Sequence, residues 1–111
     1  MLRFKPEVRI GFLMPQLAEI LAAAARWSVS TRVEVEVNSA NERVNGRLPE
    51  SLHYVDLAID LDTVGDRTDD LTSLYVYLAR TLPPGYDVVW EAKGDARWIH
   101  VEWDTHRKAT V

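Results

Sequence analysis

The sequence predicts a single α+β domain covering residues 1–111, in which helices pack on one face of a small antiparallel sheet. Two segments carry apolar residues at helical spacing, and several others alternate between apolar and polar residues as half-buried strands do. The expected order is helix, strand, long loop, strand, helix, strand, strand. The last two strands lie close enough in sequence to form a hairpin, and this order is typical of α+β domains.

The first half of the chain contains one expected helix and two expected strands. The helix begins at Pro15, because proline is favoured at the first helical position, and its apolar spacing continues to Trp27. The first strand is the alternating run 33–37. Residues 38–51 are rich in Asn, Ser, Gly and Pro, and they predict a long loop of the kind that is often functional. A second alternating strand follows at 55–61.

The second half of the chain predicts a helix followed by a hairpin. The helix extends from about Asp69, which suits the N-cap position, to Leu82, and the two prolines that follow end it. Residues 86–92 and 97–105 are expected strands, joined by the turn "KGDA".

Composition and charge exclude several classes of protein. The net charge is −4 and the chain has no dense basic run, so nucleic-acid binding is not expected. The chain has no cysteine, which excludes disulfides, thiolate metal sites and cysteine nucleophiles. No segment has the ~20 apolar residues of a membrane span. Polar residues interrupt the apolar N-terminal stretch, so no signal peptide is expected.

Three side chains stand out as candidate metal ligands. Asp60 and His100 fall on the polar faces of two expected strands, and they meet if those strands are neighbours. His53 lies just before the first of these strands. Two imidazoles and one carboxylate suit Zn²⁺ and leave a fourth position for water. From spacing alone a structural interpretation also stays open, in which His53 caps a strand, Asp60 pairs with an arginine and His100 is a surface residue.

Two stretches resemble a known family. "SLHYVDLAIDL" at 51–61 and "IHVEW" at 99–103 resemble the zinc D-Ala-D-Ala carboxypeptidase and peptidoglycan L,D-endopeptidase family, which includes vancomycin-resistance dipeptidases and phage endolysins. The short phage-encoded members are the most similar, and the resemblance spans roughly residues 15–104. It implies a hedgehog/D-Ala-D-Ala-peptidase-like fold and one zinc ion bound by His53, Asp60 and His100.

The chain departs from the family pattern at the catalytic base. Family members carry Glu, Asp or His two or three residues before the last zinc ligand, where this chain has Trp98 and Arg97. Neither side chain can accept a proton. Glu102, on the His100 face, and Glu91, where short phage relatives also have a Glu before the hairpin turn, are the remaining candidates for the base.

Candidate substrate-binding residues lie in and after the expected long loop. Arg43 and Arg47 suit planar recognition of a substrate carboxylate, although solvated charges are the default explanation of charged residues in a loop. Ser51 has two interpretations of equal weight. In the first it forms a hydrogen bond with the substrate or with a metal ligand, and in the second it only caps the loop.

Two functions follow from the resemblance. The first is zinc-dependent hydrolysis of a peptide bond in bacterial cell-wall peptide by a phage or prophage product. The second is a non-catalytic virion or binding module that keeps the fold, with or without the zinc. The expected partners are peptidoglycan peptide and virion or tail components. The expected location is the cytoplasm of the producing cell or the virion.

Overall fold

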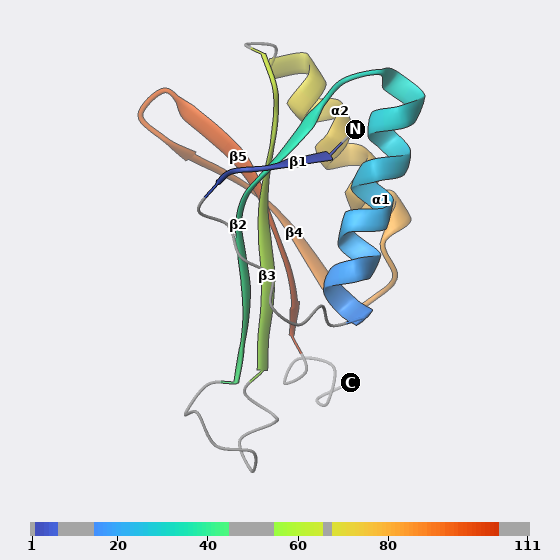
Figure 1. Cartoon of the computed structure of the whole chain (residues 1–111), viewed down its shortest axis with the longest axis vertical. Helices are drawn as coiled ribbons and strands as arrows, with labels where there is room; N and C mark the ends of the chain where they lie inside the picture. Colours follow the sequence, from blue (N-terminus) through green and yellow to red (C-terminus); the bar gives the residue numbers. More distant parts are fainter. Residues whose placement is uncertain (1, 7–14, 45–54, 66–67, 105–111) are drawn as a thin grey trace.

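Five strands form one sheet, and two helices pack against one of its faces (Figure 1). The computed structural model describes residues 2–6, 15–44, 55–65 and 68–104, with the backbone alone for 40–44, 55–57 and 104. The elements, in chain order, are β1 (Leu2–Phe4), α1 (Pro15–Thr31), β2 (Val35–Val44), β3 (Val55–Thr63), α2 (Thr68–Thr81), β4 (Tyr86–Lys93) and β5 (Ala96–Asp104).

The sheet is mixed, with the spatial order β1-β2-β3-β5-β4. Strands β2, β3, β5 and β4 pair antiparallel, and β1 alone pairs parallel, with β2. The expected α+β class and the β4–β5 hairpin are confirmed. Gly94 lies in the hairpin turn with a φ of 62°, a left-handed conformation that favours glycine. β1 was not expected, because its three residues are too few to show alternation.

The predicted loop 38–51 is wrong for residues 38–44, which belong to β2. Their Asn and Ser side chains favour turns, but pairing with β3 along the whole segment, as far as Val44 opposite Val55, overrides that local preference. The register shifts between Val37 and Ser39, which marks Asn38 as a bulge. Residues 45–51 lie outside the described residues.

The core lies between the helices and one face of the sheet. Ile59 and Leu61 of β3 and Ile99 and Val101 of β5 are fully buried there, as alternation predicts. The other buried apolar side chains are Leu17, Ile20, Ala23, Ala24, Trp27, Val35, Val37, Leu71, Leu74 and Leu78. The opposite face of the sheet carries no described helix, so the alternating polar side chains of β3 and β5 lie on an open surface (Figure 1).

Hydrogen bonds join the helices to each other and to the sheet. The indole N–H of Trp27 in α1 donates to Ser73 Oγ in α2 over 3.2 Å. The hydroxyl of Tyr86 in β4 donates to the carbonyl oxygen of Gln16 over 3.1 Å. These bonds hold the helical layer in one position against the strands that carry the polar face. No helix in the described part of the chain has the length and apolar character needed to cross a membrane.

Leu74 offers a direct test of the core. It is fully buried on α2, whereas Val76 on the same helix is 38% exposed. We expect Leu74→Ala to lower the free energy of unfolding by about 2–5 kcal/mol, because it removes buried methyl groups and leaves a cavity. Val76→Ala, the control, should change it by about 0.5 kcal/mol or less. Urea unfolding measures both, and equal effects would contradict the packing of α2 on the sheet.

Candidate metal and acid–base site

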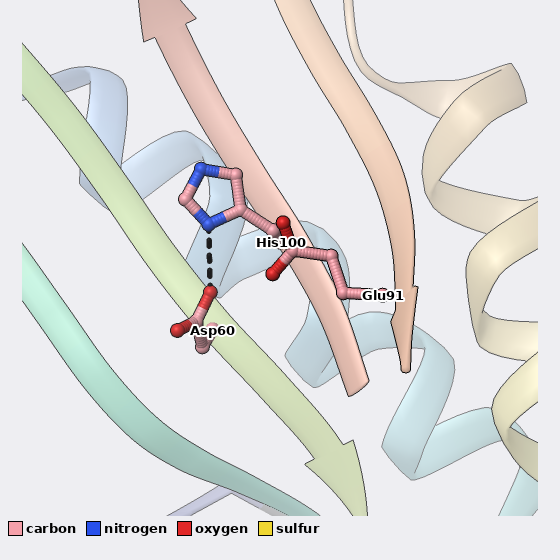
Figure 2. A group of neighbouring side chains, drawn as sticks. All are labelled: Asp60, Glu91 and His100. Atoms are coloured by element: carbon pink, nitrogen blue, oxygen red, sulfur yellow. Dashed lines mark hydrogen bonds and ion pairs between the residues drawn. The ribbon is translucent and has the colours of Figure 1, made fainter. Parts of the chain in front are cut away.

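Asp60 and His100 meet at the centre of the open face. They are direct partners in the register of β3 and β5, so both side chains project from the same side of the sheet. His100 Nδ1 lies 2.7 Å from Asp60 Oδ1 (Figure 2). Both side chains are about a quarter exposed, at 25% and 28%, which leaves them accessible to a ligand.

Two further hydrogen bonds fix the orientation of this pair. His100 Nε2 lies 2.8 Å from Glu102 Oε1, two residues along β5 on the same face. The hydroxyl of Ser39 in β2 donates to Asp60 Oδ2 over 2.9 Å. The imidazole is therefore held between two carboxylates, and both oxygens of Asp60 have a hydrogen-bond partner.

Glu91 joins the cluster from β4. It pairs with Trp98 across the hairpin, and the indole N–H of Trp98 donates to Glu91 Oε1 over 2.7 Å. One carboxylate oxygen each from Asp60 and Glu91 and one ring nitrogen of His100 all lie within 4.8 Å of one another (Figure 2). Three adjacent strands thus contribute one candidate ligand each to the same spot on the open face.

The two carboxylates change the protonation of His100. Partial burial lowers the pKa of its imidazole, but the hydrogen bonds with Glu102 and Asp60 outweigh burial, and the pKa is raised above its usual 6.5. A carboxylate at each ring nitrogen favours the doubly protonated ring, because both nitrogens then donate.

The raised pKa of His100 predicts a pH-dependent stability of the metal-free protein. A raised folded-state pKa stabilises the protein fully below about pH 6.5, the unfolded value, and this stabilisation is lost as the pH rises through the folded-state value. Asp60, Glu102 and Glu91 are the charged groups around the ring. Urea unfolding in chelator between about pH 5.5 and 9 should show this fall. His100→Asn should flatten it, and an equally steep profile in that variant would show that another group is responsible.

The donor set fits a zinc ion. An imidazole and carboxylates are ordinary ligands of Zn²⁺, and the three side chains come from paired strands rather than from independent loops. Glu102 can accept a hydrogen bond from a protonated Nε2. Nδ1 is then the ring nitrogen free to bind a metal, and it lies on the side of Asp60. Exposed acidic groups also gather without a metal, so this fit makes the site a candidate.

The other predicted site residues are not among the described members of the cluster. His53, Ser51 and Arg47 lie outside the described residues. Arg43 lies in β2 opposite Asp56, four positions beyond Ser39, which is roughly 13 Å along the strand. Its backbone position is therefore well separated from the Asp60–His100 pair.

Ser39 and Trp98 were missed as contributors to this site. Ser39 stood in the predicted loop, and only the β2–β3 register places it opposite Asp60. Trp98 was interpreted only as a residue that replaces the usual base, whereas its indole N–H donates to the carboxylate of Glu91 and orients it. The signal for Trp98 was its place on the same polar face as His100, because the indole N–H of a partly buried tryptophan usually has a hydrogen-bond partner.

Comparisons with protein-family models, curated proteins and solved structures give no match to this chain. Its chemistry is therefore inferred from the cluster and the sequence motifs. One ring nitrogen and several carboxylates on an accessible face can hold a divalent cation and move a proton beside it.

Proposed function

We propose that this chain is a zinc-dependent peptidase that hydrolyses a peptide bond in bacterial cell-wall peptide. The observation that carries the proposal is the cluster of Asp60, His100 and Glu91 on the open face of the sheet. The resemblance of "SLHYVDLAIDL" and "IHVEW" to the zinc carboxypeptidase and endopeptidase family supports the same chemistry and the same substrate class.

Asp60 and His100, together with His53 of the sequence motif, would hold the zinc ion. A zinc ion bound there lowers the pKa of a water ligand towards neutrality and polarises the substrate carbonyl. Glu102 accepts a hydrogen bond from the Nε2–H of His100. This bond keeps Nδ1 unprotonated and directed at the metal position. Ser39 restrains the second oxygen of Asp60 in the same way.

Glu91 is assigned as the general base, and Glu102 as a positioning residue. The carboxylate of Glu102 is already engaged with the ring of His100, whereas Glu91 is held by Trp98, a donor that is not itself a candidate ligand. Glu91 takes a proton from the attacking water and passes it to the departing amine. The proposed base thus comes from β4, the strand next to β5. Trp98, which occupies the usual place of the base in the family, orients the Glu91 carboxylate.

The test combines zinc analysis with an assay on wall peptide. Native protein should contain one zinc per chain, and it should cleave purified wall peptides into products detected by mass spectrometry. A chelator should abolish cleavage, and added zinc should restore it. Protein that binds zinc but cleaves no wall peptide would support the alternative, a non-catalytic virion or binding module. Protein that binds no zinc would contradict the peptidase function, whereas the binding module does not require the metal.

A further inference from the structure

β4 (Tyr86–Lys93) is one edge of the sheet, and β5 is its only neighbour among the described strands. Every second residue of an edge strand directs its backbone N–H and C=O groups away from the neighbouring strand. Proteins often protect such an edge with a proline or a bulge. β4 contains no proline, and its register with β5 is unbroken from Tyr86 to Lys93. Within the described part of the chain, this edge is therefore open to pairing with another strand.

An apolar row runs along the helix side of this edge. Val88, Trp90 and Ala92 share that side, because Trp90 pairs with Ile99 of the core. The ring of Trp90 meets Tyr75 of α2 edge to face, with the ring centroids 6.0 Å apart, which gives it a defined orientation. Val88 and Trp90 are only partly buried and Ala92 is exposed, so the row keeps apolar surface that a partner can cover.

Charges of opposite sign stand at the two ends of β4 on the open face. Asp87, near the start of the strand, and Lys93, its last residue, lie on the same side as Glu91. Val89, between the two charged ends, is 41% exposed. The carboxylate of Glu91 is held towards β5, because the indole N–H of Trp98 donates to it over 2.7 Å. A strand with an acidic start and a basic end is complementary to an antiparallel copy of itself.

A second copy of this chain can pair with β4 about a two-fold axis perpendicular to the sheet. Side chains of the two open faces then lie opposite one another, and so do those of the two helix sides. Two registers of this kind pair the longest stretch of β4, one centred on Val89 and one centred on Trp90. The first places Asp87 of each copy opposite Glu91 of the other, whereas the second places it opposite Lys93. Like charges directly opposite each other are unfavourable and opposite charges are favourable, so the charges select the register centred on Trp90.

We propose that two copies of this chain form a dimer through β4, paired antiparallel with Trp90 at the centre. In this register Val88 lies opposite Ala92 of the second copy, and the Trp90 side chains of the two copies lie opposite each other. Two ion pairs, Asp87 with Lys93 of the other copy, close the two ends of the paired segment. The sheets of the two copies become one continuous sheet. The two-fold axis keeps both helical layers on one side, so both candidate metal clusters face the other side of the dimer.

Sedimentation equilibrium of the full chain tests the dimer, in chelator so that a bridging metal cannot join the copies. A dissociation constant of about 1–100 µM is expected, because two paired strands bury less surface than a standard interface. Above that concentration the backbone amides of β4 should exchange with deuterium more slowly than in dilute protein, whereas those of α1 should not change. A monomer at all concentrations up to about 1 mM would overturn the inference. A dimer with unchanged exchange in β4 would overturn it as well.

Reversal of either charge should weaken the dimer. Lys93→Glu and Asp87→Lys each place like charges opposite each other at two symmetric positions, and each should raise the dissociation constant at least about tenfold. Arg26→Glu is the control, because it makes the same change of charge as Lys93→Glu at an exposed position of α1. It should leave the dissociation constant unchanged. Equal weakening by Arg26→Glu would assign the effect to net charge and refute the strand register.

Restoring the opposite charges distinguishes the register from damage to the fold. The double variant Asp87→Lys/Lys93→Glu exchanges the two charges, and its dissociation constant should return close to the native value. An equal mixture of the two single variants should form a mixed dimer, because every charge then lies opposite one of the other sign. Weakening by the single variants that neither test reverses would refute the register. Self-association that neither single variant weakens would place the interface elsewhere and overturn the proposal.

Discussion

Glu91→Gln is expected to lower kcat on wall peptide by about 10²–10⁴-fold, because a positioned acid–base group typically contributes that much. Glutamine keeps the shape of the side chain, and its amide oxygen can still accept the Trp98 indole N–H. It cannot take up a proton, so the chemistry is removed while the local structure is kept. Steady-state kinetics measure the loss, and elemental analysis should show unchanged zinc.

Two variants control the Glu91 result. Glu102→Gln keeps an oxygen that can accept the Nε2 proton of His100, so its effect should be confined to about 10–100-fold in zinc affinity or activity. Trp98→Phe keeps an aromatic ring but loses the donor to Glu91, and it should lower kcat by about tenfold with zinc content unchanged. If Glu102→Gln silences the protein and Glu91→Gln does not, the base is Glu102.

His100→Ala is expected to abolish zinc binding and the stability that zinc confers. Zinc at a hundredfold excess over its dissociation constant should stabilise the native protein by about 2.7 kcal/mol. Without the imidazole of His100, the proposed ligand set keeps only Asp60 and His53, one ligand fewer than the three protein ligands of catalytic zinc sites. Thermal unfolding with zinc and with chelator measures the difference between the two melting temperatures, which should approach zero in the variant.

The zinc-dependent shift is the informative quantity, because His100→Ala also removes the two hydrogen bonds of the ring. His106→Ala is the matched control, since that histidine belongs to neither family motif. It should keep the native shift. Asp60→Asn keeps the size of the side chain and should lose most of the shift as well. A full zinc shift in both the His100 and Asp60 variants would place the metal elsewhere.

The sequence by itself determined which side chains share a face. Alternation along 55–61 and 97–105 separates Ile59 and Ile99 from Asp60 and His100, and the structure places the first pair in the core and the second on the open surface. This information is local, because neighbouring residues of a strand point to opposite sides. The helix from 69 to 82 was predicted within one residue of α2 for the same reason, from its own spacing and first-turn acids.

Only the tertiary structure decided which strands are neighbours and in which register. Asp60 faces His100 because β5 lies between β3 and β4, a long-range choice that burial of the whole core determines. The same register brings Ser39 to Asp60 and Glu91 to Trp98. The pairing of β3 with β5 ends at Leu61 and Ile99, a divergence that no local pattern records. The residues suited to bind a metal could therefore be identified from the sequence. The side chains that contact them depend on the pairing of strands far apart in sequence.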